Sequence, residues 1–224
     1  MAQLRLKIMN RKDNTLGVRV KKLEVNEVEV VRRTAETEIT CRISSGKKQK
    51  WNLDTGLHFF NHMIEELAYF SKFNIDATVK SPHFLLTHTV LEDTGITMGR
   101  AFYELAMIRG KRSGIRSCGS GIGILDEAYV YARISLEGRA ATYVSRHTRR
   151  FGVVEDVQEE FLESFFQGFA QGMKLTIQLD LMRADDPHHL WEACFRAFGG
   201  ALEETLLLDE WKQGGIAGVK GTID

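Results

Sequence analysis

The stretches HTVLEDTGITMG at residues 88–99 and HHLWEACFRAF at residues 188–198 decide the fold of this chain. Each begins with a histidine that is followed four positions later by a glutamate, and each continues into an apolar segment with the period of a helix. The same spacing at two equivalent helix starts indicates an internal duplication. We therefore expect two halves of similar structure, related by an approximate twofold axis.

The segments around these two helices also follow one repeated order. In the first half, β-branched alternation predicts two strands between residues 18 and 43, and LHFFNHMIEELAYFS predicts an amphipathic helix. FNIDATVKS then predicts a strand, and LEDTGITMGRAFYELAMI a helix that ends at Gly110. In the second half, EAYVYARISLEG and RAATYVSRHT predict strands, EDVQEEFLESFFQGFAQGM a helix, KLTIQLDLM a strand and HHLWEACFRAFGGALEETLLL the closing helix. The order strand, strand, helix, strand, helix occurs twice, which predicts an α+β fold.

This repeat also predicts how the chain is divided. We expect a polar, flexible arm at residues 1–15, a first half at residues 16–115, and a second half at residues 116–224 that ends in an anion-binding loop.

The composition excludes several classes of protein. Thirty Lys and Arg residues balance thirty Asp and Glu residues, which removes the basic field that nucleic acid or an anionic membrane would require. Apolar runs are shorter than the roughly 18 residues that cross a bilayer, and charges interrupt the N-terminal stretch where a signal peptide is apolar. A cytoplasmic protein with a small-molecule partner is therefore expected. Cys41, Cys118 and Cys194 are widely separated, so we expect buried thiols and not a disulfide framework or a thiolate metal site.

The repeated histidine and glutamate spacing suits a divalent metal. Residues four apart lie on one face of a helix, so His88 with Glu92, and His188 with Glu192, can each offer an imidazole and a carboxylate to one point. Such a donor set favours Mn, Fe, Zn or Ni over Ca or Mg. One such pair is commonly a surface pair, but its duplication, with His189 adjacent, gives a metal site and a surface pair about equal support. The neighbouring His189 projects about 100° away from His188, so the two rings suit separate ions.

Other groups are weaker candidates for chemistry. His62 lies in the first predicted helix, where, taken alone, it is better explained as a buried, hydrogen-bonded histidine than as a ligand, and Glu160 occupies the comparable place in the second half. The stretches GKRSGIRSCGSGIG and GGIAGVKG combine basic side chains with glycine, which suits a phosphate or another small anion, although such turns also occur without ligands.

Taken together, these motifs resemble the imidazoleglycerol-phosphate dehydratase family, manganese-dependent lyases of histidine biosynthesis. TGLHFFNHM is similar to the family's TG-x-x-FFDHM, HTVLEDTGITMG to HHTVEDTGIALG, and HHLWEACFRAF to HHxxEAxFKAF. RRTAETEI, LDE, LEGRA and GVKG are similar to further motifs, so the resemblance runs from about Val31 to Gly221. It implies duplicated β-α-β-β-α halves of the ribosomal protein S5 domain 2-like type. It also implies a homo-oligomer with sites at subunit contacts, trimer-based and with up to 24 subunits.

The resemblance further implies a reaction and its residues. The family removes water from imidazoleglycerol phosphate to give imidazole acetol phosphate, which implies one or two Mn²⁺ ions per subunit here, or another first-row divalent metal. The residues at the metal-ligand positions are His62, His88, Glu92, Glu160, His188, His189 and Glu192. Glu36 falls at the acid/base glutamate, and Glu192 is expected to serve catalysis as well as the metal. The residues at the phosphate positions are Arg116, Arg139 and Lys220.

The chain departs from the family pattern within these motifs. Thr89 replaces the second histidine of the first pair, and Glu160 replaces another histidine ligand. Asn61 replaces an aspartate beside the first ligand, Phe70 replaces a histidine, and residues 218–219 replace the Ser and Thr of the closing loop. Two alternatives therefore stay open. One is a divergent metal-dependent lyase or isomerase acting on another small phosphorylated or anionic substrate, and the other is a non-catalytic metal-binding assembly protein.

Overall fold

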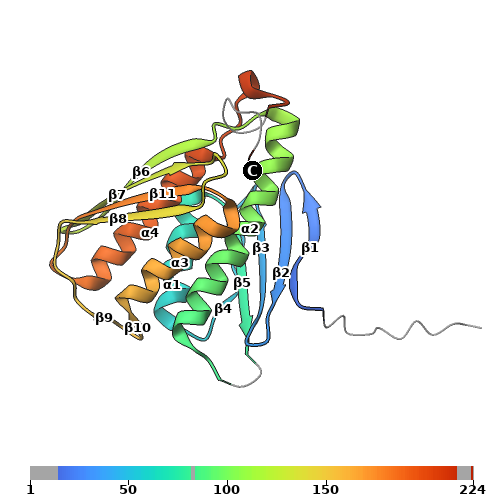
Figure 1. The fold of residues 1–224 in the computed structure, drawn as a ribbon. Coiled ribbons are helices and arrows are strands. Elements are labelled where there is room, and N and C mark those ends of the chain that lie inside the picture. Colours follow the sequence, from blue (N-terminus) through green and yellow to red (C-terminus); the bar gives the residue numbers. More distant parts are fainter. Residues whose placement is uncertain (1–14, 82–83, 216–222, 224) are drawn as a thin grey trace, which may run out of the picture.

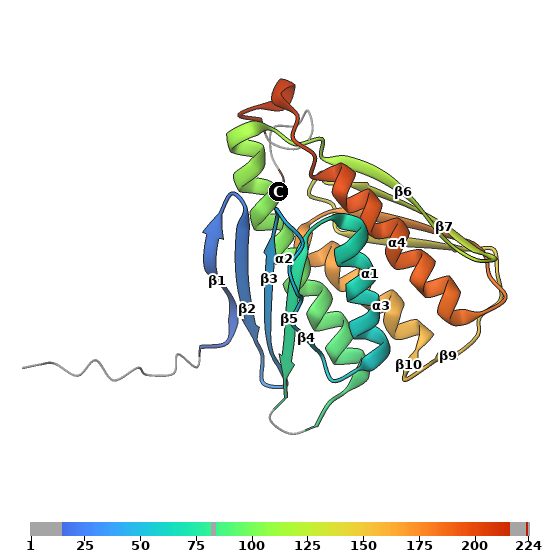
Figure 2. The same cartoon turned by 180° about the vertical axis from the view of Figure 1, so that it is seen from behind.

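The computed structural model describes residues 15–81, 84–215 and 223. In this part of the chain, a layer of helices lies between two β-sheets (Figures 1 and 2). The α+β class expected from the sequence is confirmed. None of the helices described has the length and apolar character that a membrane span requires.

The first half builds one sheet and two helices. Its elements are β1 (Gly17–Glu24), β2 (Glu27–Arg33), β3 (Glu38–Ser44), β4 (Leu53–Asp54), α1 (His58–Ser71), β5 (Asn74–Lys80) and α2 (Thr87–Ser113). The strand order in the sheet is β1-β2-β3-β5-β4.

The second half builds the other sheet and two more helices. Its elements are β6 (Cys118–Leu125), β7 (Ala128–Ser135), β8 (Ala141–Arg146), β9 (Val153–Val154), β10 (Val157–Gln158), α3 (Glu159–Met173), β11 (Thr176–Arg183), α4 (Pro187–Thr205) and a short 3₁₀ turn (Glu210–Lys212). The sheet order is β6-β7-β11-β8, and β9 and β10 form a separate two-stranded ribbon.

The two sheets repeat one topology. In both β2-β3-β5-β4 and β6-β7-β11-β8, the first two pairings are antiparallel and the last is parallel. The order of strands and helices along the chain repeats as well, so α1 corresponds to α3 and α2 to α4. The repeated order agrees with the predicted duplication, whereas the boundary at residue 115 stays a prediction. The strand β1 has no counterpart in the second sheet.

Several predicted elements were wrong. Residues 18–43 form parts of three strands and not two, and α2 continues past Gly110 to Ser113. The second half, as far as it is described, has six strands and not the three expected, because residues 118–123 of the glycine-rich stretch that suggested an anion-binding loop lie in β6, and because β9 and β10 precede α3. Cys118, at the start of this strand, is exposed and not buried, whereas Cys41 and Cys194 are buried as expected.

The glycines of β6 have a packing role. Gly119, Gly121 and Gly123 lie on the strand face that meets α4, and a Cβ at any of them would overlap a backbone carbonyl of that helix. Glycine weakens an isolated strand, because it loses more conformational entropy and offers no side chain to pack. Here the lack of a side chain at these glycines lets the α4 backbone lie directly on the sheet. Residue propensities alone do not predict a strand of this kind.

Close helix packing orders the layer between the sheets. A Cβ at Gly95 or Gly99 of α2 would overlap backbone atoms of α3, and one at Gly168 or Gly172 of α3 would overlap the backbone of α2. In each half, one strand runs back between two helices, so all four helices begin at the same end of the molecule (Figure 1). Every predicted metal-ligand position therefore lies at that end.

Candidate metal centre

The first two turns of α1 and α4 carry the residues that converge. His62 lies in the second turn of α1, and His188 and Glu192 lie one turn apart at the start of α4. The start of α4 is well defined, because the Asp186 carboxylate accepts a hydrogen bond from the His188 backbone N–H at 2.7 Å and Pro187 opens the helix. The side chains on α4 therefore project from a capped, fixed helix end.

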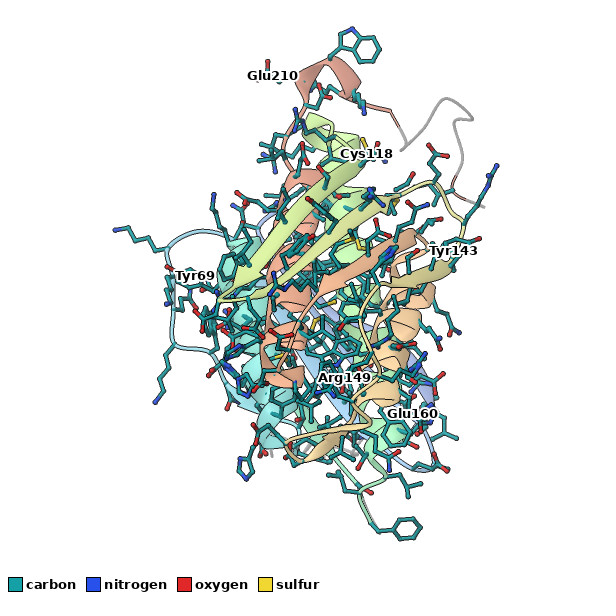
Figure 3. All side chains as sticks on the ribbon, turned by 90° about the vertical axis from the view of Figure 1, so that its left-hand side faces the viewer. Tyr69, Cys118, Tyr143, Arg149, Glu160 and Glu210 are labelled. Atoms are coloured by element: carbon teal, nitrogen blue, oxygen red, sulfur yellow. The ribbon has the colours of Figure 1, made fainter. Side chains whose placement is uncertain are left out.

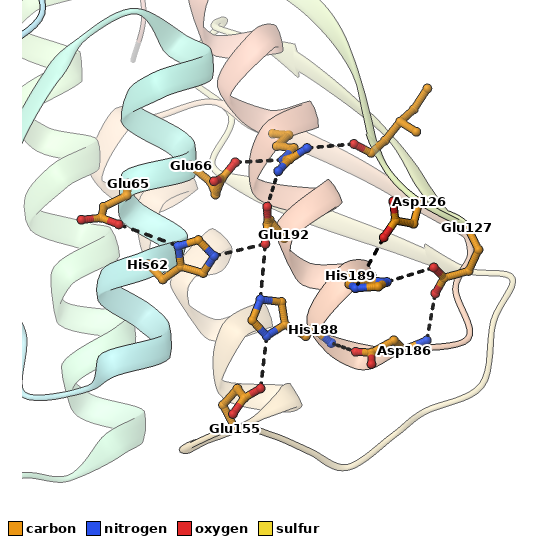
Figure 4. A network of polar contacts seen from close by, with 12 residues as sticks. His62, Glu65, Glu66, Asp126, Glu127, Glu155, Asp186, His188, His189 and Glu192 are labelled. Carbon is orange, nitrogen blue, oxygen red and sulfur yellow. Dashed lines mark hydrogen bonds and ion pairs between the residues drawn. The ribbon is translucent and has the colours of Figure 1, made fainter.

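Two imidazoles and one carboxylate meet at a single point. His62 Nε2 lies 3.1 Å and His188 Nε2 3.3 Å from the same oxygen, Glu192 Oε2 (Figure 4). Across the three residues, the potential ligand atoms lie within 4.8 Å of one another. Among the described residues, this is the His, Cys, Asp and Glu group that could hold a metal ion.

The far nitrogen of each imidazole faces a carboxylate. His188 Nδ1 lies 3.1 Å from Glu155 Oε1, and His62 Nδ1 lies 3.7 Å from Glu65 Oε2. A carboxylate behind a histidine ligand fixes the orientation of the ring and raises the basicity of the nitrogen that faces the metal. Both rings thus have the surroundings of histidines that bind metal.

The other oxygen of Glu192 is held by an arginine. The Arg196 guanidinium donates to Glu192 Oε1, to Glu66 Oε2 at 2.8 Å and to the Ile124 carbonyl at 3.1 Å (Figure 4). Glu192 is only 7% exposed. Burial by itself would raise the pKa of this carboxyl, but the hydrogen bond with His62 and the charge of Arg196 outweigh it and hold the pKa below the ordinary value. Glu192 therefore stays anionic, with Oε2 directed at the two histidines.

This donor set fits a first-row divalent cation. Two imidazole nitrogens and one carboxylate oxygen are favoured by Mn, Fe, Ni and Zn, and the described cluster contains no thiolate. Three protein ligands also leave coordination positions for a substrate, as catalytic sites require.

His189 turns away from this cluster. Its ring makes an angle of 84° with that of His188, and its Nδ1 lies 2.9 Å from Glu127 Oε2 in the β6–β7 turn. The hydrogen bond with His189, helped by backbone N–H donors, lowers the pKa of Glu127 to about 2, and Glu127 in turn raises the pKa of His189. The two adjacent histidines therefore contact different carboxylates, as expected for neighbouring residues on a helix.

The equivalent residues of the first half do not assemble in the same way. By the repeat, Glu160 on α3 corresponds to His62, while His88 and Glu92 on α2 correspond to His188 and Glu192. In the described chain these three residues form no group comparable to the first. His88 is exposed, with its ring 5.3 Å from that of Phe161, and Glu160 is exposed as well.

Comparison with known proteins agrees with this geometry. A family model for imidazoleglycerol-phosphate dehydratase matches residues 55–202, which include all three residues of the cluster. The imidazoleglycerol-phosphate dehydratase of Aromatoleum aromaticum is 33% identical over 202 residues, covering 89% of this chain and all of the relative. That of Marinobacter nauticus is 34% identical over 194 residues, covering 87% and 96%.

Solved structures point the same way. The crystal structure of the dehydratase from Pyrococcus furiosus, in complex with (S)-C348, superimposes with a TM-score of 0.72 at 25% identity and covers 85% of this chain and 98% of that one. The imidazoleglycerol-phosphate dehydratase of Staphylococcus aureus gives a TM-score of 0.67 at 26% identity, covering 82% and 99%. The chain belongs to the imidazoleglycerol-phosphate dehydratase family.

The glutamate at the family's acid/base position lies near a different helix start. Glu36 sits in the turn between β2 and β3 and, with Thr89 and Leu86, lines a hollow of about 50 Å³ beside the start of α2. Thr37, the next residue, donates its hydroxyl to Asp93 Oδ2 at 2.7 Å, and Arg32 pairs with Asp93 Oδ1 at 2.6 Å. These contacts with Asp93, the residue after Glu92, hold the turn that carries Glu36 against α2.

The residues at the family's phosphate positions lie at the other end of the second half. Arg116 forms an ion pair with Glu204 at 2.5 Å. Glu204 follows His188 by sixteen residues on α4, so the two residues lie about 24 Å apart along the helix axis. Arg139 lies in the β7–β8 turn, at the same end of that sheet. Figure 3 shows the neighbouring Cys118 far from Glu160. A single chain therefore keeps both arginines apart from the metal cluster, and Lys220 lies outside the described residues.

Two of the family departures have structural partners. The Asn61 side-chain oxygen accepts hydrogen bonds from the Thr55 hydroxyl at 2.7 Å and the Thr55 backbone N–H at 3.1 Å, which fixes the loop before α1. Phe70 packs against Arg196, whose guanidinium carbon lies 5.2 Å from the ring centroid. The residue that replaces a family histidine therefore supports the arginine that holds Glu192.

Sequence reasoning missed the groups around the ligands. Arg196 follows Glu192 by four residues in the quoted HHLWEACFRAF stretch, so helical spacing alone could have indicated their contact. Glu155 lies in the ribbon before α3, far from His188 in the sequence, and no local pattern points to it.

Proposed function

We propose that this protein is a metal-dependent hydro-lyase that removes water from imidazoleglycerol phosphate to give imidazole acetol phosphate in histidine biosynthesis. The observation that carries the proposal is the convergence of His62, His188 and Glu192, in a chain of this family, on one point with a donor set for a first-row metal. We assign Mn²⁺ as the metal, from the resemblance that the motifs carry.

The metal would be held by these three side chains. When bound, it supplies a positive charge that stabilises negative charge developing on the substrate's imidazole ring. Glu65 and Glu155 keep the two histidines oriented, and Arg196 keeps one oxygen of Glu192 occupied so that the other faces the metal.

The reaction breaks one C–H and one C–O bond on neighbouring carbons and leaves an enol that becomes the ketone of the product. Glu36 is assigned as the group that takes the carbon-bound proton, and the hydroxyl leaves as water after receiving a proton. Arg116, Arg139 and Lys220 are assigned to the substrate phosphate, for which charge-assisted hydrogen bonds are well suited.

Within one chain these groups stand apart, so we propose that each complete site is shared between chains of a homo-oligomer. His189, His88, Glu92 and Glu160, which do not join the cluster in a single chain, are assigned to a second metal position completed by a neighbouring subunit. A trimer-based assembly of up to 24 subunits would provide such contacts, as the family resemblance implies.

The deciding experiment measures dehydration of imidazoleglycerol phosphate by the Mn²⁺-loaded protein. We expect turnover that falls at least about a hundredfold in His188→Ala, because the variant loses a metal ligand. His58→Ala is the matched control, since His58 is exposed one turn before His62 on α1 and contributes to no ligand group, and its activity should equal that of the unchanged protein.

Two results would favour the alternatives. Metal bound in stoichiometric amount without turnover of imidazoleglycerol phosphate would favour a lyase or isomerase of another anionic substrate, which the Thr89 and Glu160 departures would then explain. A protein that neither turns over this substrate nor rescues a histidine auxotroph, and that binds no metal, would leave only a structural role.

A further inference from the structure

A second hollow lies at the opposite end of α1 from His62. Its volume is about 390 Å³, and its lining includes Lys48, Trp51, Tyr69, Lys72 and Phe73. Tyr69 follows His62 by seven residues, which places the two about 10 Å apart along the helix axis. Figure 3 shows Tyr69 at the left-hand edge of the molecule. This hollow is thus separate from the metal centre.

The loop that borders this hollow is strongly basic. Lys47, Lys48 and Lys50 follow one another between Gly46 and Trp51 without an intervening acidic residue. The Lys48 ammonium lies 4.9 Å from the Trp51 ring centroid and 4.8 Å from that of Tyr69. Among the residues with described side chains, no carboxylate forms an ion pair with it. The cation is therefore positioned by two aromatic rings and is still available to an anion.

A buried amide holds the loop in shape. Asn74 is only 7% exposed, and its side-chain oxygen accepts hydrogen bonds from Gln49 N–H at 2.8 Å and the Trp51 indole N–H at 3.4 Å. Its side-chain NH₂ donates to the Lys47 carbonyl at 3.0 Å. An ordered loop loses less entropy on binding than a flexible one, so these bonds preorganise the lysines.

A buried cation stands behind the same hollow. Arg109 is 8% exposed, and its guanidinium carbon lies 5.3 Å from the centroid of Phe73, which lines the hollow. It donates to the Ser45 hydroxyl at 2.7 Å and the Val25 carbonyl at 3.0 Å, which are both neutral, and no carboxylate of the described chain pairs with it. Buried charges are ordinarily paired, so this arginine adds a positive charge without a carboxylate partner behind Phe73, on one side of the hollow.

We propose that this hollow binds a small phosphorylated compound that carries a flat ring, of about the size of a mononucleotide. Its volume is within the range of small-molecule sites, roughly 300–1,000 Å³. Lys48 and Lys72 meet the phosphate, and the side chains of Trp51 and Tyr69 that line the hollow contact the flat ring. The Lys72 ammonium already forms an ion pair with Glu203 of α4 at 2.7 Å. A ligand that attracts this ammonium would therefore act on an ion pair between the end of α1 and α4.

The test is calorimetric titration of the metal-loaded protein with AMP, and separately with adenosine and with inorganic phosphate. We expect AMP to bind more tightly than either part alone. Lys48→Met and Trp51→Leu should each weaken AMP binding about tenfold, since each removes one of the two recognition elements. Lys80→Met removes an exposed lysine at the far end of β5 and should leave the affinity unchanged.

Three results would overturn this inference. The first is no detectable AMP binding at AMP concentrations up to about 5 mM. The second is an AMP affinity that is unchanged in both variants, which would place the binding elsewhere on the protein. The third is an affinity for adenosine equal to that for AMP. Dehydratase activity measured on the same samples keeps the outcomes separate, because neither Lys48 nor Trp51 belongs to the proposed reaction site. Circular dichroism melting shows whether each variant is folded.

Discussion

At the scale of single residues, the candidate centre depends on how each donor atom is oriented. Glu192 Oε2 faces both imidazoles because Oε1 is taken by Arg196, and His188 Nε2 faces that oxygen because Nδ1 faces Glu155. The groups behind the ligands therefore determine which atoms a metal can reach.

Glu155→Gln tests this orientation. The amide keeps the size of the side chain but removes the negative charge behind His188, so the His188 ring becomes a weaker and less oriented donor. We expect metal affinity to fall about tenfold in a competition titration with a chelator. Glu210→Gln changes an exposed glutamate of the 3₁₀ turn at the other end of the molecule and should not alter the affinity. Equal affinities for the two variants would contradict the role of Glu155.

The Glu127 and His189 pair makes a prediction about pH. The pKa of His189 is raised in the folded protein, so its contribution to stability is present below its unfolded value near pH 6.5 and is lost as the pH rises through the folded value. The pKa of Glu127 is lowered to about 2, so its contribution is present above its ordinary value of 4.5 and is lost as the pH falls toward 2. The pair is therefore fully formed between about pH 4.5 and 6.5.

Glu127→Gln should consequently destabilise the protein more at about pH 5.5 than at about pH 8.5, because the contribution of the charged pair is lost as the pH rises through the raised pKa of His189. Urea unfolding of the variant and the unchanged protein at both pH values measures the difference. A loss of stability that is the same at both values would mean that His189 and Glu127 do not form a charged pair.

At the scale of elements, the placement of α4 depends on β6. This helix carries His188 and Glu192 at one end, and it lies on the strand through backbone contact at Gly119, Gly121 and Gly123. The α2 and α3 helices approach each other through glycines in the same way. Small residues at these contacts therefore set the positions of the helix starts that bear the ligands.

Gly121→Ala should disturb this placement. The new Cβ would overlap the Ala197 carbonyl, so the helix must move away from the sheet, and we expect a loss of several kcal/mol in unfolding free energy together with weaker metal binding. Gly200→Ala is the matched control on α4 itself, because its nearest neighbour would be Gly121 Cα at 3.7 Å, an ordinary contact. Denaturant unfolding of both variants checks this, and a Gly121→Ala protein as stable as the control would contradict the packing argument.

At the scale of the whole molecule, one chain separates groups that the proposed reaction needs together. The metal cluster lies where the helices begin, whereas Arg116 and Arg139 lie where the second sheet meets the end of α4. The outer face of that sheet also exposes Ile122, Ile124 and Tyr143, which is unusual for a surface that meets only water. Both features fit a chain that works as part of a homo-oligomer.

Subunit mixing tests whether sites are shared. His188→Ala and Arg116→Ala chains should each be inactive alone, but after mixed assembly, sites that combine an intact His188 from one chain with an intact Arg116 from another should work. For random mixing of equal amounts, about a quarter of the sites would be intact. No recovered activity in a mixed oligomer of confirmed composition would show that both residues act within one chain.

The sequence by itself determined the features that depend on local spacing. The α+β class and the repeated order of elements follow from hydrophobic periods of two residues for strands and 3.6 residues for helices. The pairing of His188 with Glu192 follows from their spacing of four residues on one helix, because helix geometry is local. Its motifs also carried the family resemblance. The strand β6 escaped prediction, since the reason for its glycines is a helix that lies some seventy residues later in the chain.

Only the tertiary structure decided which donors meet. His62 joins His188 and Glu192 because α1 of the first half packs beside α4 of the second, while the equivalent Glu160, His88 and Glu92 do not assemble in the described chain. His189 contacts Glu127 and His188 contacts Glu155, and in both pairs the residues are distant in sequence. Arg196 orients Glu192 from the next turn of the same helix. Local helix geometry determines the direction in which a side chain projects. The packing of helices from the two halves determines which other side chains it contacts.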